Sequence, residues 1–149
     1  MRARFALVLA LTACAPPSPG APATFDDFCS AKFDPPTSAG QSGELARVAI
    51  EGWLVPPGMF SVCSDTCSFD LAEQQGGGGR TIRYSVRFGD EKNRLAQLEE
   101  HFKPEDFKLR TQSDEQLGFG DEVRLHGGRL GMAERKDCQL YAVDLIEKP

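Results

Sequence analysis

The stretch Arg80-Thr-Ile-Arg-Tyr-Ser-Val-Arg-Phe88 alternates polar and apolar side chains more regularly than any other part of the chain. Successive side chains of a β-strand point to opposite faces, so this period of two predicts a strand with one face in the core. The preceding segment, 74–79, contains four consecutive glycines and predicts a flexible hairpin tip. Residues 68–72 alternate again, with Phe69 and Leu71 on the inward face. The two strands and their tip predict a β-hairpin.

Further strands are predicted on either side of this hairpin. Residues 45–54 form the first, and Gly52 within it marks a bulge or bend. Residues 107–110 predict a short irregular strand, and residues 120–127 predict a longer one that a glycine-rich loop follows. Residues 138–146 form a hydrophobic final strand. The side chains expected to point inward from the first and fourth long strands are Val48, Ile50, Leu54, Val123 and Leu125.

A helix is predicted between the third and fourth long strands. Asp90 is a good N-cap for residues 91–102, and Pro104 ends the segment. One apolar stripe at helical spacing is expected to pack on the core, and it consists of Leu95, Leu98 and Phe102.

The resulting order, β-β-β-α-β-β, resembles that of the OB-fold, a five-stranded Greek-key barrel. Two local segments add to the resemblance: Val48-Ala-Ile-Glu-Gly-Trp53, with its glycine in mid-strand, and Gly120-Asp-Glu-Val-Arg-Leu-His-Gly127. The resemblance implies a mainly β domain over residues 44–149, with one helix between strands three and four. A different small β-barrel or an α+β sheet would also accommodate this order.

The N-terminus, Met1-Arg-Ala-Arg-Phe-Ala-Leu-Val-Leu-Ala-Leu-Thr-Ala-Cys14, has two arginines before an uninterrupted apolar run. It resembles a bacterial lipoprotein signal peptide, in which residues 1–13 are removed and Cys14 is lipidated. An ordinary secretory signal with a chance cysteine is the alternative. The run is much shorter than the ~20 apolar residues that span a bilayer. Ala15 resembles the outer-membrane sorting signal, so we expect a lipid-anchored protein of the bacterial envelope, facing the periplasm or the cell surface.

Residues 14–43 follow the signal segment and are rich in Pro, Ser, Gly and Ala. This composition predicts an extended tether. Residues 25–33 interrupt it with three phenylalanines around Cys29, and we expect a short turn there that docks on the domain.

Four cysteines remain if Cys14 carries lipid, namely Cys29, Cys63, Cys67 and Cys138. An even number in an exported chain predicts two disulfides, for which three connectivities are possible. We favour Cys63–Cys67 with Cys29–Cys138, which would staple the N-terminal arm to the last strand. The alternative is a metal site built from the four cysteines with His126, but the Cys63–Cys67 gap lacks zinc-knuckle spacing. We therefore expect no metal and no cofactor.

The chain has a net charge of −5, and loss of residues 1–13 with Arg2 and Arg4 makes the mature charge −7. Nucleic-acid binding depends on clustered Lys and Arg and, for single strands, on exposed aromatic side chains. The outward side chains of strands two and three include no aromatic residue; they are Ser68, Asp70, Ala72, Thr81, Arg83, Ser85 and Arg87. We therefore expect no nucleic-acid partner, and membrane attachment through the lipid.

Three arginines, Arg83, Arg87 and Arg124, could form a site for a glycan or a small anion, with Trp53 as a stacking platform. The alternative is that Arg83 and Arg87 pair across strands with Asp70 and neighbouring carboxylates. Trp53 is out of phase with the inward side chains of its strand. It either packs beneath the helix or the N-terminal arm, or lines an open face.

Catalysis has little support in the sequence. His101 and His126 have no serine or cysteine partner in a recognisable setting, and we expect both on the surface. We therefore expect a non-enzymatic binding or interaction module. Two alternatives stay open: a glycan- or small-anion-binding protein that uses the outer sheet face, and an assembly accessory that contacts an envelope protein complex through the loops at 56–67 and 127–137.

Overall fold

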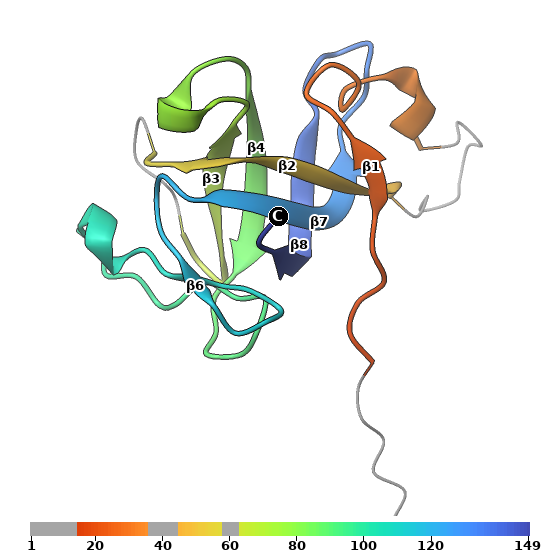
Figure 1. Ribbon diagram of the computed structural model, residues 1–149. Coiled ribbons are helices and arrows are strands. Elements are labelled where there is room, and N and C mark those ends of the chain that lie inside the picture. Colours follow the sequence, from red (N-terminus) through yellow and green to blue (C-terminus); the bar gives the residue numbers. More distant parts are fainter. Residues whose placement is uncertain (1–14, 36–44, 58–62) are drawn as a thin grey trace, which may run out of the picture.

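Five strands close into a barrel in the order β2-β3-β4-β8-β7, because β2 pairs with β7 as well as with β3 (Figure 1). The computed structural model describes residues 15–35, 45–57 and 63–149, so the predicted signal peptide and lipidated Cys14 lie outside the described residues. The β4–β8 pairing is parallel and the other barrel pairings are antiparallel. The barrel strands are β2 (Arg47–Val55), β3 (Thr66–Ala72), β4 (Thr81–Arg87), β7 (Glu122–Leu130) and β8 (Gln139–Glu147). The predicted mainly β, five-stranded Greek-key barrel is confirmed.

Short elements decorate this barrel. They are the strands β1 (Ala21–Ala23), β5 (Leu109–Arg110) and β6 (Gln116–Leu117), and the 3-10 turns η1 (Ala31–Phe33), η2 (Gln75–Gly77) and η3 (Pro104–Asp106). Strands β5 and β6 form a separate two-stranded sheet. Within the described ranges no helix has the length and apolar character needed to cross a membrane.

Strand β2 bends where the sequence predicts a bulge or bend. Its first seven residues pair with β7, and from Trp53 onward it pairs with β3. A Cβ on Gly52 would lie 2.7 Å from the carbonyl oxygen of Ala72. A glycine is therefore needed where β2 and β3 approach each other. The inward side chains predicted for β2 and β7 are all buried in the barrel core.

Strand β7 is longer than predicted. It runs through Gly127 and Gly128 to Leu130, where the sequence predicts a loop. A Cβ on Gly127 would lie 2.8 Å from the carbonyl oxygen of Tyr141 on β8. The glycines therefore serve close packing of the two strands, beside an irregularity in the pairing between His126 and Gly128.

The predicted helix over residues 91–102 is wrong. The segment contains turns and an isolated bridge at Leu95, and η3 is the only helical turn between β4 and β7, a part of the chain that is described throughout. The Leu95 N–H donates to the carbonyl of Arg87, and the Leu95 carbonyl accepts from Gly89. Asn93 has a φ of 60°, which interrupts a helix. Backbone bonds to the strand end thus replace helical bonds, although Leu95 is fully buried as predicted.

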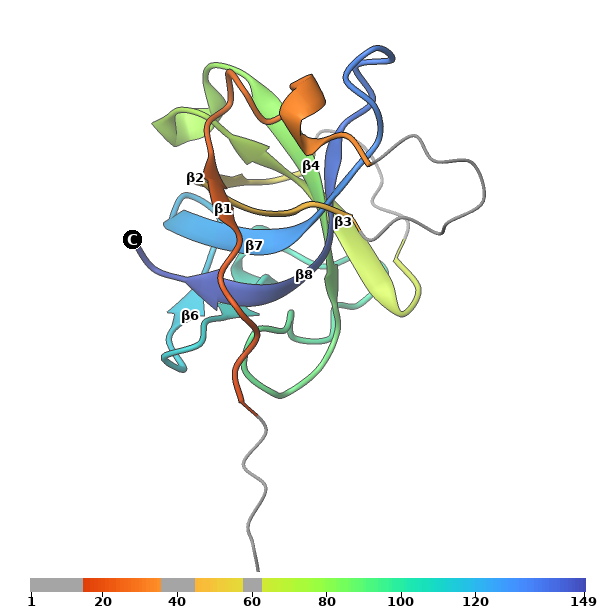
Figure 2. The ribbon, with the colours of Figure 1, turned by 90° about the vertical axis from the view of Figure 1, so that its right-hand side faces the viewer.

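The arm of residues 15–35 lies partly on the barrel, which corrects part of the predicted 14–43 tether. Strand β1 pairs in parallel with β2, and Figure 2 shows the arm crossing the outer side of β2 and β7. The predicted docked turn at 25–33 is present, with Phe28 and Phe33 buried. The favoured disulfide pairing is confirmed: Cys29–Cys138 joins the arm to the start of β8, and Cys63–Cys67 closes the loop before β3.

A buried arginine also fixes the arm. Arg129 on β7 is 0% exposed, and its guanidinium forms an ion pair with Asp34 of the arm. The same guanidinium donates to the carbonyl oxygens of Ser30 and Gly131. The arm, β7 and the loop before β8 are therefore joined through one side chain.

Candidate binding cleft along the N-terminal arm

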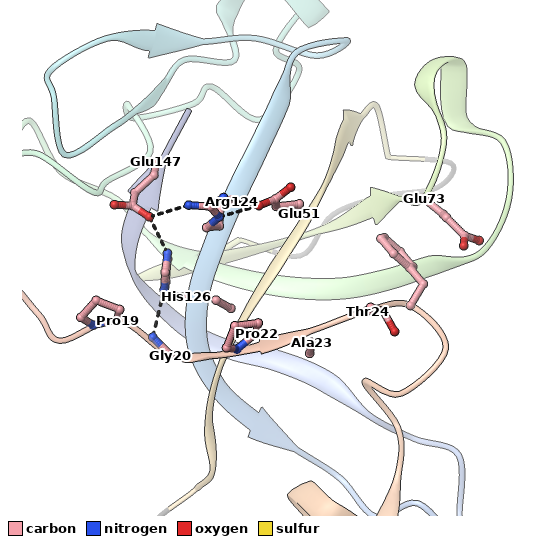
Figure 3. A pocket seen from close by; sticks show the side chains of 12 residues that line it. Pro19, Gly20, Pro22, Ala23, Thr24, Glu51, Glu73, Arg124, His126 and Glu147 are labelled. Carbon is pink, nitrogen blue, oxygen red and sulfur yellow. Dashed lines mark hydrogen bonds and ion pairs between the residues drawn. The ribbon is translucent and has the colours of Figure 1, made fainter. Parts of the chain in front are cut away.

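The N-terminal arm and the barrel enclose an open cleft of about 760 Å³ between them (Figure 3). Pro22, Thr24 and Phe25 of the arm lie on one side. The outward side chains of β2, β7 and β8 supply the other, with Glu51, Arg124 and Glu147 among them. This volume is in the range of small-molecule sites, roughly 300–1,000 Å³.

Gly20 sets the distance between the arm and the barrel. Its N–H donates to Nδ1 of His126 at 3.0 Å. A Cβ at this position would lie 2.3 Å from the carbonyl carbon of Val48, so a larger residue would displace the arm. The cleft therefore depends on a glycine at this position.

His126 is buried, with 2% of its surface exposed, so the prediction that it lies on the surface is wrong. His101 is exposed as predicted. Nδ1 of His126 accepts the Gly20 N–H, so the proton of the neutral imidazole lies on Nε2, 2.9 Å from Oε2 of Glu147. Both ring nitrogens are thus occupied, and the ring joins the arm to β8.

Ion pairs cross the floor of the cleft between neighbouring strands. Arg124 on β7 donates from Nε to Glu51 on β2 at 2.7 Å, and its Nη1 lies 3.7 Å from Glu147 on β8. The hydrogen bond to Glu51 raises the pKa of Arg124 above its ordinary value. These contacts hold the outward side chains of three strands in one row (Figure 3).

Carboxylates outnumber cationic groups in the cleft. Among the described residues that line it, Glu51, Glu73 and Glu147 carry carboxylates and Arg124 carries a guanidinium, while Arg80 outside the cleft pairs with Glu73. Hydrogen bonds from Arg80 lower the pKa of Glu73 to about 2, so this carboxylate is ionised at neutral pH. The cleft therefore disfavours an anionic ligand and offers acceptors to hydroxyl or amino groups.

Of the four ligand-binding residues predicted from the sequence, only Arg124 lines the cleft. Arg83 lies 3.4 Å from Asp70 across β3 and β4, as the cross-strand alternative predicts. Arg87 lies at the end of β4, and Trp53 is opposite Ala72 of β3 and Glu122 of β7. The predicted composite site of Trp53 with three arginines is therefore not assembled in the cleft.

The sequence gives little signal for the residues that build the cleft instead. Gly20 stands among prolines in a stretch whose composition indicates a tether, and Glu147 is one of many carboxylates. His126 is the last residue before Gly127, where the predicted strand ends and a glycine-rich loop is expected to begin. Parallel pairing of a three-residue strand leaves no periodicity that a sequence pattern can detect.

No family model matches the chain, and comparisons with curated proteins and with solved structures give no match. Within residues 15–35, 45–57 and 63–149, no group of three His, Cys, Asp or Glu side chains is arranged to hold a metal ion. The geometry of the cleft is therefore the main guide to function.

Proposed function

We propose that the protein is a lipid-anchored, non-enzymatic binding module of the bacterial cell envelope whose ligand lies in the cleft along the N-terminal arm. The main support is that the arm, which follows Cys14 directly, is itself one wall of the cleft. Hydrogen bonding, a disulfide and a buried ion pair fix the arm on the barrel. The cleft is thus preformed, and a preformed site avoids the entropy cost of ordering a loop on binding.

The chemistry of the cleft favours binding over catalysis. Both nitrogens of His126 are engaged, one by a backbone N–H and one by Glu147, so neither is directed at a nucleophile. Thr24 is the hydroxyl residue among the described residues that line the cleft, and it donates to Asp27. The hydrogen bond from Lys32 lowers the pKa of Asp27, so this carboxylate is a weak base. Activation of a nucleophile requires a base within hydrogen-bond reach of it.

A neutral oligosaccharide is the ligand class that fits best. Carboxylates and Arg124 can accept from and donate to sugar hydroxyls, while Pro22, Phe25 and Ala49 supply apolar surface. OB-folds are known to take oligosaccharides, although a fold alone does not fix a function. Arg80 compensates the charge of Glu73, and Arg124 is shared between Glu51 and Glu147, which leaves one uncompensated carboxylate charge in the cleft. The small-anion alternative therefore has less support here than a neutral ligand.

The anchor is tested by Cys14→Ser. We expect complete loss of the protein from the membrane fraction or a block in its processing, because acyl chains supply the attachment. Mass spectrometry of the N-terminal peptide and membrane fractionation measure this. Cys63→Ser is the matched control and should stay anchored. A Cys14→Ser protein that remains on membranes without acyl mass contradicts the anchor, and inner-membrane location contradicts the sorting signal.

The binding site is tested by photo-cross-linking in intact envelopes. A photoreactive amino acid at Thr24, which is exposed at the cleft, is expected to give an adduct that glycan-degrading enzymes shorten. The same amino acid at Gln75, exposed on the hairpin tip, should give none. Gly20→Ala should abolish the adduct by displacing the arm.

An adduct that proves to be a protein would favour the assembly-accessory hypothesis over glycan binding. Equal adducts from Thr24 and Gln75 would show that the cleft is not the site.

A further inference from the structure

We propose that a second site, at the end of β4, binds a phosphate group through Arg87 and Arg94, and that lipid headgroups supply this phosphate. The binding itself is independent of the function proposed above. Only the source of the phosphate rests on the proposed lipid anchor.

The two arginines line a hollow of about 170 Å³ together with Ala142, Val143 and Asp144. Neither arginine has an ion-pair partner among the described residues. Every other arginine in the described part of the chain is within ion-pair distance of a carboxylate. The two arginines that lack this neutralisation therefore share one hollow, in a chain whose net charge is negative.

Asp144 lines the hollow but is already engaged. Its two carboxylate oxygens accept from Nη1 and Nη2 of Arg47 at 3.0 and 2.6 Å. This bidentate pair is internally neutral, so the guanidinium charges of Arg87 and Arg94 are left for a ligand.

The backbone holds the two arginines in position relative to each other. The N–H of Leu95, next to Arg94, donates to the carbonyl oxygen of Arg87 at 3.0 Å. The Arg94 carbonyl in turn accepts from Arg110 at 2.9 Å, and Leu95 is fully buried. Arg94 thus belongs to the segment 91–102, which was predicted to be a helix and instead bonds to the end of β4.

Phosphate matches this hollow in charge and in hydrogen bonding. A guanidinium presents N–H donors in a planar fork that suits phosphate oxygens, and two guanidinium groups balance a phosphate dianion. A neutral sugar would leave both charges uncompensated. The hollow therefore differs in ligand class from the carboxylate-lined cleft.

The hollow lies beside the segment that leads to the anchor. The guanidinium of Arg47 that binds Asp144 also donates from Nε to the carbonyl oxygen of Ser18, at 2.5 Å. Ser18 is four residues after Cys14, and four extended residues span at most about 14 Å. A lipid on Cys14 would therefore bring headgroup phosphates close to Arg87 and Arg94.

The phosphate site is tested by titrating inorganic phosphate into the purified mature protein in uncharged detergent. We expect saturable shifts of the Arg87 and Arg94 Nε–H resonances by NMR. Arg87→Gln or Arg94→Gln should each weaken binding about five-fold, as loss of one solvent-exposed ion pair of about 1 kcal/mol implies, and the double variant should weaken it more than either single variant. Arg83→Gln, on the same strand but paired with Asp70, is the control and should leave binding unchanged. No saturable shift, or equal weakening in the control, overturns the site.

The headgroup source is tested by reconstitution into phosphatidylcholine vesicles that contain phosphatidylglycerol. Solid-state NMR should detect proximity between headgroup phosphorus and the guanidinium nitrogens of Arg87 and Arg94, and Arg87→Gln with Arg94→Gln should abolish it. Phosphate binding in detergent without proximity in vesicles assigns the site to free phosphate and overturns the lipid source. If the mature protein carries no acyl chains, both the lipid anchor and the lipid source of the phosphate are contradicted. The detergent titration tests the phosphate site in either case.

Discussion

Replacing Cys29 and Cys138 together by alanine is expected to lower the free energy of unfolding by about 4–5 kcal/mol. The two cysteines are 109 residues apart in sequence, so their bond restricts most of the unfolded chain. In the chain-entropy model, the stabilisation grows with the logarithm of the closed loop. Urea unfolding monitored by circular dichroism of the purified protein measures the change.

The second disulfide provides a matched control. Cys63 and Cys67 are four residues apart, and removing their bond by the same double alanine change is expected to cost about 2 kcal/mol in the same model. The urea m-value should rise only for the Cys29 and Cys138 variant, because its unfolded state becomes more expanded. Equal losses of stability and unchanged m-values for both variants would show that loop closure is not the main effect.

The strands of this fold could be predicted because each has one face in the core. In β4, Ile82, Tyr84 and Val86 are buried while Thr81 and Arg83 are exposed, as the alternation predicts. Ser85, predicted to point outward, is buried instead, and its hydroxyl accepts from the N–H of Ala142 on β8. The chain order of such strands then limits the topology to a few small barrels. The even number of cysteines predicted two disulfides with three possible connectivities, and the favoured pairing is the one present.

The sequence alone could not exclude the predicted helix, because the apolar residues at helical spacing do lie on the core side of the segment. Leu95, Leu98 and Phe102 do pack at the core, as a helical stripe would. The deciding interactions are distant: the side-chain oxygen of Asn93 accepts from Ile146, 53 residues away. Long-range hydrogen bonds of this kind override local propensity and leave no periodic signal.

The cleft was beyond prediction for a related reason. Its walls come from the arm, β2, β7 and β8. The arm is rich in proline and glycine, a composition that is typical of linkers, so the sequence does not indicate a docked segment. Arg124 was identified as a candidate by residue type, but its carboxylate partners at 51 and 147 are set by strand register. The cross-strand alternative holds for Arg83, which pairs with Asp70, and not for Arg87, which has no ion-pair partner among the described residues.

Asp34→Ala is expected to lower the melting temperature by about 10 °C or more, because it leaves the charge of Arg129 buried without its partner. Arg129 is 0% exposed, and Asp34 is its carboxylate contact among the described residues. Adding Arg129→Met should restore much of the loss, since an apolar side chain of similar length has no charge to compensate. A double variant as unstable as Asp34→Ala would show that the loss comes from packing and not from the unpaired charge.

The same ion pair should give a defined pH dependence. The hydrogen bond from Arg129 holds the pKa of Asp34 below its ordinary value of 3.8. A carboxyl whose pKa is lower in the folded state stabilises the fold above its unfolded-state pKa, and this contribution is lost as pH falls through the folded-state pKa. The melting temperatures of the wild type and Asp34→Ala should therefore differ by a constant amount between pH 5 and 7 and converge below about pH 4. Calorimetry across this range measures the convergence, and a difference that persists unchanged to pH 2 would show that the ionised carboxylate of Asp34 is not what holds the arm.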